Sequence, residues 1–70
     1  MGKNDSVQLT QRQVEVLKLI VAGHTSKEIA ERMGVSKRTV DGHRLNLLRK
    51  TDSRNALELS AWAYKQGIVE

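Results

Sequence analysis

The chain has no cysteine and no proline, and only two of its 70 residues are aromatic. Without cysteine it can form no disulfide framework, no thiolate metal site and no thiol nucleophile. It also lacks a signal-peptide pattern and any apolar run near the ~20 residues that cross a bilayer. A chain of this length has no room for a deep substrate cleft. We therefore expect a cytoplasmic domain that is not an enzyme and needs no cofactor.

The composition is that of one small helical domain. Hydrophobic residues make up 39% and charged residues 29% of the chain, which is typical of a folded protein. β-branched residues do not alternate with polar ones, so strands are not expected. The first eight residues are polar and lack periodicity, which predicts a flexible N-terminal arm at 1–8 before a single domain at 9–70.

Capping residues divide this domain into four helices. Thr10 and Thr25 each begin the spacing of a capping box, and Ser36 and Asn55 precede two further helical stretches. Apolar residues recur at helical spacing after each of them. The predicted fold class is all-α, with helices at about 11–22, 26–33, 37–50 and 56–66.

The second and third predicted helices are joined by only three residues, 34–36. So short a connection cannot make an antiparallel pair, and the two helices must cross steeply. Ala30 is small enough for a close crossing, Gly34 can adopt a positive φ, and Val40 can point back at the preceding helix. This pattern is typical of a helix-turn-helix, although an ordinary helical corner would share part of it.

The charge is concentrated in the third predicted helix. Residues 37–50 hold five basic residues and one acid, and this excess of four equals the net charge of +4 for the whole chain. A solvated basic face would account for it, but a basic helix within a helix-turn-helix favours DNA binding.

From Leu9 to Lys50 the sequence LTQRQVEVLKLIVAGHTSKEIAERMGVSKRTVDGHRLNLLRK resembles the LuxR/FixJ/NarL-type (GerE-like) DNA-binding domain of bacterial transcription regulators. The resemblance continues to Ile68 without gaps. It implies four helices, with the third in the major groove of double-stranded DNA and the fourth forming a weak homodimer on a pseudo-palindromic site. The chain would be the output domain of a two-component response regulator or a free-standing GerE-like regulator. RNA polymerase is a further candidate partner.

The helical wheel and this resemblance together predict the DNA-binding residues. At the starts of the second and third helices, backbone N–H groups and nearby side chains would hold phosphates, and the candidates are Thr25, Ser26, Lys27, Ser36 and Lys37. One face of the third helix would enter the groove with Arg38, Asp41, Gly42, Leu45 and Arg49. Thr39 and Asn46 lie on its flank, and Lys50 beyond them is expected to bind a phosphate.

The base-reading residues are unusual for this family. The positions of Asp41, Gly42 and Leu45 supply base contacts in the family, often from Lys, Arg or Val. Asp41 could accept a hydrogen bond from cytosine, or pair with Arg38 or Arg44 on the surface. Leu45 could meet thymine methyl groups or simply be exposed. Arg38 and Arg49 are therefore the candidates for direct readout.

The two histidines and an apolar stripe on the fourth predicted helix are further candidates for a function. His24 and His43 are not spaced as metal ligands, so no metal site is expected. In the fourth helix Leu57, Ala61 and Tyr64 form an apolar stripe, which predicts the dimer interface; the alternative is that they pack on the first helix. Asp52 and Ala56 depart from the family's usual residues at the junction of the last two helices.

The sequence thus predicts sequence-specific DNA binding for transcription regulation. The alternative is a protein-interaction module that kept the helix-turn-helix fold and lost base reading. The positive charge by itself would also permit RNA binding. However, the two aromatic residues lie off the basic face and offer no surface on which single-stranded bases could stack.

Overall fold

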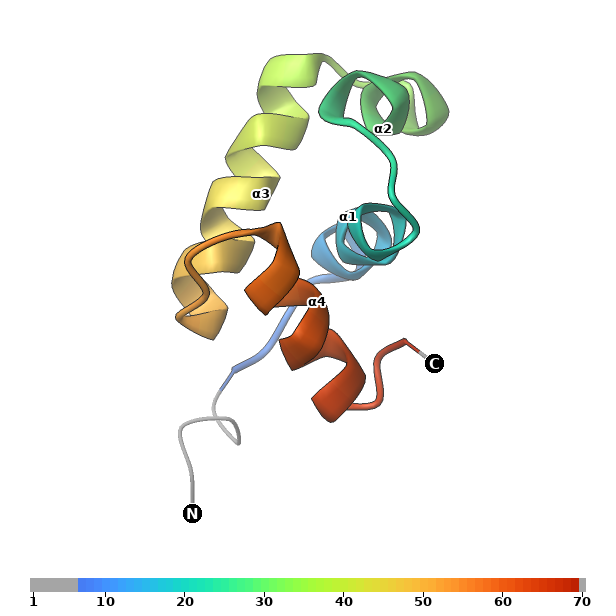
Figure 1. Ribbon diagram of the computed structural model, residues 1–70. Coiled ribbons are helices and arrows are strands. Elements are labelled where there is room, and N and C mark those ends of the chain that lie inside the picture. Colours follow the sequence, from blue (N-terminus) through green and yellow to red (C-terminus); the bar gives the residue numbers. More distant parts are fainter. Residues whose placement is uncertain (1–6, 70) are drawn as a thin grey trace.

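The computed structural model describes residues 7–69, and most of the arm predicted at 1–8 lies outside this range. Its secondary structure consists of four helices without a strand in the described residues: α1 (Gln11–Val21), α2 (Ser26–Met33), α3 (Lys37–Thr51) and α4 (Ala56–Lys65). Figure 1 shows α3 along one side of the molecule, with α2 across its first turns and α4 beside its last turns. The predicted all-α fold is confirmed, and no predicted helix boundary differs by more than one residue. Within residues 7–69, no helix is long and apolar enough to span a membrane.

Each helix begins at a side chain that caps it. The Thr10 hydroxyl accepts from the Gln13 N–H at 3.1 Å, and the Gln13 amide oxygen accepts from the Thr10 N–H at 2.9 Å. Thr25 and Glu28 form the same reciprocal pair at the start of α2. Satisfying these otherwise free N–H groups stabilises a helix by about 1 kcal/mol per cap. The capping boxes predicted from the sequence are therefore confirmed.

The connection between α2 and α3 is the turn of a helix-turn-helix. Gly34 lies at φ 70°, in the left-handed region, and ends α2. The N–H of Val35 then bonds the Ala30 carbonyl at 3.1 Å, and Ser36 caps α3. Ala30 is buried at the crossing, and Val40 is fully buried beneath it. These contacts confirm the roles predicted for Ala30, Gly34 and Val40.

A single apolar core holds the four helices together. α1 and α3 each contact all three of the other helices. The largest fully buried side chains come from every helix, and they are Val16, Leu17, Ile29, Val40, Leu47 and Leu59. Because α3 contacts the other three helices and buries Val40 and Leu47 among them, the core determines which face of α3 points to solvent.

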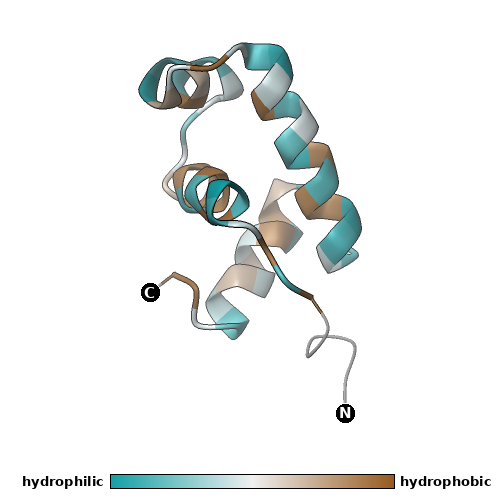
Figure 2. Ribbon diagram, turned by 180° about the vertical axis from the view of Figure 1, so that it is seen from behind, coloured by the Kyte–Doolittle hydropathy of each residue, from teal (hydrophilic) through white to brown (hydrophobic). Residues whose placement is uncertain are grey.

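α4 has one buried face and one exposed face. Leu59 and Ala63 are buried in the core, whereas Leu57 is 80% exposed and Tyr64 54% exposed. Ala61, between these two, is also exposed. Figure 2 shows α4 coloured mostly brown to white, while α3 alternates hydrophilic and hydrophobic segments. The alternative in which this stripe packs on α1 is therefore excluded, and α4 presents an apolar strip of Leu57, Ala61 and Tyr64 to solvent.

Leu59 and Leu57 provide a matched pair for testing the core. Leu59→Ala removes a fully buried side chain, and we expect it to lower the free energy of unfolding by about 2–5 kcal/mol. Leu57→Ala, in the same helix, should change it by less than about 0.5 kcal/mol because this side chain is mostly exposed. Urea denaturation followed by circular dichroism would measure both, and equal losses would contradict this description of the core.

Candidate nucleic-acid interface

The residues predicted to enter the groove share one exposed face of α3. Arg38, Asp41, Gly42, Leu45 and Arg49 are all exposed, with Leu45 at 49%. On the opposite face, Val40 and Leu47 have no exposed surface. An α-helix turns by about 100° per residue, so two buried positions seven residues apart lie on one stripe and turn the other stripe outward. We call the five exposed residues the outer face of α3.

Asp41 on this outer face has a partner within its own helix. The Lys37 ammonium donates to the Asp41 carboxylate at 3.0 Å, and both side chains are about half exposed or more. This bond is the main cause that lowers the pKa of Asp41, and the Ser26 side chain at the start of α2 lowers that pKa further. Asp41 therefore stays ionised and offsets part of the positive charge at the beginning of α3.

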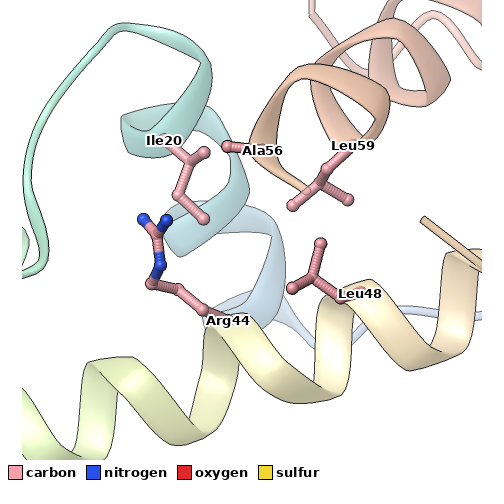
Figure 3. Close-up of a pocket in the computed structure, with 5 residues that line it drawn as sticks. All are labelled: Ile20, Arg44, Leu48, Ala56 and Leu59. Carbon is pink, nitrogen blue, oxygen red and sulfur yellow. The ribbon is translucent and has the colours of Figure 1, made fainter. Parts of the chain in front are cut away.

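The partner predicted for Asp41 was wrong. Arg38 or Arg44 was the expected partner on the surface, whereas Lys37 makes the bond. Residues four apart on a helix lie one above the other, so Lys37 reaches Asp41 directly. Arg44 adds only a weaker electrostatic attraction to Asp41. Its side chain instead extends toward Ile20 of α1 and lines a small notch (Figure 3).

The start of α2 lies beside the first two turns of α3. The two helices pack against each other there (Figure 1), and the Ser26 side chain at the start of α2 lowers the pKa of Asp41 in the second turn of α3. Five of the six phosphate candidates belong to these two starts, and they are Thr25, Ser26 and Lys27 at α2 and Ser36 and Lys37 at α3. Ser26 is half-buried, and the other four are exposed. Two helix N-termini with partial positive charge are thus brought to one surface.

The cap residues at this surface already make local hydrogen bonds. The Ser36 hydroxyl accepts from the Thr39 N–H at 3.1 Å and lies 3.0 Å from the Thr39 hydroxyl. At α2, the Glu28 carboxylate accepts from the Thr25 N–H at 2.9 Å and lies 3.6 Å from the His24 ring. The bond from the Thr25 backbone is the main cause that lowers the pKa of Glu28.

Lys50 is placed differently from the other predicted contacts. It lies in the last turn of α3, and its ammonium donates to the Gln8 carbonyl at 3.0 Å and to the Gln13 amide oxygen at 3.3 Å. Gln13 is 6% exposed and is the buried polar residue of the described core. From the sequence, Gln13 was predicted only as part of a capping box. No local pattern predicts its bond to Lys50, which lies 37 positions away.

The histidines and the notch beside Arg44 are the remaining candidates for a metal or ligand site within residues 7–69. His24 belongs to the start of α2, while His43 is half-buried in α3, and no group of three His, Cys, Asp or Glu side chains could hold a metal ion among the described residues. The notch in Figure 3 lies between α1, α3 and α4 and is lined by Ile20, Arg44, Leu48, Ala56 and Leu59. Its volume of about 10 Å³ has room for about one water molecule.

Residues 7–63 match the family described as bacterial regulatory proteins, luxR family. The chain is 44% identical over 61 residues to the uncharacterized response regulatory protein YgeK of Escherichia coli, covering 87% of this chain and 42% of that protein. It is 43% identical to the transcriptional regulatory protein MctR of Rhizobium johnstonii, covering 87% of this chain and 28% of MctR. The chain therefore spans less than half the length of these relatives.

Solved structures of a luxR-type receptor have the same fold. A Vibrio cholerae VqmA dimer in the absence of target DNA superposes with a TM-score of 0.87 and 32% identity, over 97% of this chain and 31% of that chain. A complex of VqmA with its ligand and DNA superposes with a TM-score of 0.82 and 34% identity, over 89% and 27% of the two chains.

Glu28 should make the stability of α2 depend on pH. Its pKa in the folded chain is lowered from 4.5, so its charge stabilises the fold above that value, and this contribution is lost as the pH falls through the lowered pKa. Glu28→Gln keeps a hydrogen-bond acceptor and removes the charge. We expect the wild type to be more stable than the variant at neutral pH and the difference to disappear in acid. Urea denaturation across this pH range measures it, and a pH-independent difference would contradict the expectation.

Proposed function

The chain belongs to the luxR family of bacterial regulatory proteins, whose helix-turn-helix domains bind DNA and are not enzymes, and we propose that it recognises a specific double-stranded DNA sequence through α3. The observation that carries this proposal is the outer face of α3. It is exposed, basic at both ends, and held by a helix-turn-helix whose two helix starts lie on one surface. A helix presented in this way fits the major groove of B-DNA.

Phosphates would position the domain on the duplex. The free N–H groups at the starts of α2 and α3 attract anions, and Lys27 and Lys37 add charge to these starts. Lys37 would have to share its ammonium between Asp41 and a phosphate, since it already bonds Asp41. These contacts carry no sequence information, and they set the depth and direction of α3 in the groove.

Base reading is assigned to the outer face itself. Arg38 and Arg49 are exposed cations that can each donate two hydrogen bonds to a guanine. Leu45 offers an apolar surface to thymine methyl groups, and Gly42 lets the helix approach the base edges closely. Thr39 and Asn46 are exposed on the flank, where they can reach bases or sugars. Asp41 either accepts from a cytosine amino group or serves only to neutralise Lys37.

The apolar strip on α4 suits a second copy of the domain. Leu57, Ala61 and Tyr64 are exposed without polar cover, and one of the structures with this fold is described as a dimer. Three residues cover far less than the ~800 Å² per partner of a stable interface, so the pair would be weak and form on DNA. Two-fold pairing would place the α3 helices about 34 Å apart, one turn of DNA.

We also propose that the chain is the DNA-binding part of a response regulator. The relatives that it matches include response regulatory and transcriptional regulatory proteins more than twice as long as the matched region. A contact with RNA polymerase stays a prediction from the resemblance.

Selection from randomised duplexes tests the function. The purified chain would retain duplexes that are then sequenced, and enrichment of an inverted repeat is expected. Cytosine opposite the position of Asp41 would assign that residue to base reading. Retention without enrichment that vanishes with added salt would show a phosphate-binding surface only, and would favour the protein-interaction module.

Arg49→Ala should weaken binding to the selected sequence. Loss of a bidentate base contact costs about 1–3 kcal/mol and relaxes the preference at one base pair. Lys65→Ala removes an equal charge at the end of α4 and serves as the control. Fluorescence anisotropy with the selected duplex and its single-base variants measures both, and an affinity unchanged by Arg49→Ala would remove this residue from the interface.

Leu57→Glu should abolish cooperative binding. The new charge would face the same residue of the second copy across a two-fold axis, whereas binding to a single half-site should be unchanged. Gln11→Glu adds the same charge to the exposed start of α1 as a control. Gel-shift titrations on one and two half-sites measure the effect, and retained cooperativity would exclude the α4 strip as the interface.

A further inference from the structure

The last turn of α3 is tied to the start of the domain by one side chain. Lys50 donates to the backbone carbonyl of Gln8, 42 positions earlier, and to the side chain of Gln13. Two of the three N–H donors of its ammonium are therefore used by intramolecular bonds, although the side chain is exposed. The other phosphate candidates differ from Lys50 in this respect, because they lie at the starts of α2 and α3, at the opposite end of α3.

Gln13 joins this link to the beginning of α1. Its amide oxygen accepts from the Thr10 N–H at 2.9 Å as well as from Lys50 at 3.3 Å. Because Gln13 is 6% exposed, its oxygen has little access to water that could replace a lost partner. One buried oxygen thus connects the cap of α1 with the end of α3.

This link lies next to a residue assigned to base reading. Arg49 directly precedes Lys50, and Leu45 is just over one turn earlier on the outer face. The first half of α3 is held by the turn from α2 and by Val40. Its second half is held by Leu47 in the core and by the Lys50 bonds at its end. A base contact tolerates little displacement, so the setting of these last turns matters for readout.

We propose that Lys50 and Gln13 are positioning residues for sequence readout: their bond holds the end of α3 against α1, so that Arg49 meets its base, and Lys50 is not a phosphate ligand. This inference rests on the proposed function of α3. It replaces the phosphate contact predicted for Lys50 from the sequence with a positioning role.

Three variants separate the two roles of Lys50. Lys50→Met removes the donors, Gln13→Met removes the buried acceptor and leaves the Lys50 charge in place, and Gln13→Glu keeps an acceptor and supplies a full charge. Lys27→Met, at the exposed start of α2, is the matched control for loss of a phosphate contact. For each, the affinity for the selected duplex and for a random duplex would be measured across salt concentrations, with the folded fraction determined by circular dichroism.

For a positioning pair, both methionine variants should lower the ratio of specific to random affinity by a similar factor, about tenfold for one charge-assisted hydrogen bond. Neither should change the slope of log affinity against log salt. Gln13→Glu should retain the ratio, and Lys27→Met should lower the slope by about one unit without changing the ratio.

Two results would overturn the inference alone. One is a slope about one unit lower for Lys50→Met with the ratio unchanged, which marks a phosphate ligand. The other is a loss of stability in both methionine variants with the ratio of the folded protein unchanged, which marks a purely structural bond. A wild type without any sequence preference would instead overturn the proposed function, and the positioning role with it.

Discussion

Burial of Val40 and Leu47 is the constraint on which the interface depends. These two residues are the fully buried members of α3, and they lie seven positions apart on one stripe of the helix. As long as both stay in the core, Arg38, Leu45 and Arg49 must face solvent. The core of the domain and the candidate DNA-binding surface thus use opposite faces of the same helix.

Fewer of the basic side chains of α3 are free for DNA than its composition indicates. Five basic residues fall in the range 37–50, yet Lys37 is paired with Asp41 and Lys50 bonds the start of the domain. Arg44 lines the notch between α1 and α4. Arg38 and Arg49 are the exposed cations left on the outer face, one near each end. This distribution is why the proposed function assigns base reading to these two arginines, with Gly42 and Leu45 between them.

Membership of the luxR family agrees with the fold, but it does not by itself identify the DNA sequence that the outer face of α3 would read. The match covers residues 7–63, and the solved relatives superpose on nearly the whole chain. An acid, a glycine and a leucine on the outer face nevertheless form an unusual reading surface. The shared fold therefore accounts for how α3 is presented, while the sequence preference that we propose would depend on these three outer-face residues and the two arginines.

The sequence by itself determined the four helices, the turn between α2 and α3, and the exposed face of α3, whereas the exposure of the α4 strip was decided by packing. Caps such as Thr10 and Thr25 bond residues only three positions away, and Gly34 ends a helix through its own backbone, so these signals are local. Tertiary structure alone decided the partners of the long side chains. Lys37, Arg38 and Arg44 all lie three or four positions from Asp41 along α3. Lys37 makes the bond, whereas Arg44 lines the notch beside Ile20 of α1. Lys50 met Gln8 and Gln13 because α1 docks on the end of α3, and no pattern within a few residues encodes a contact across 42 positions.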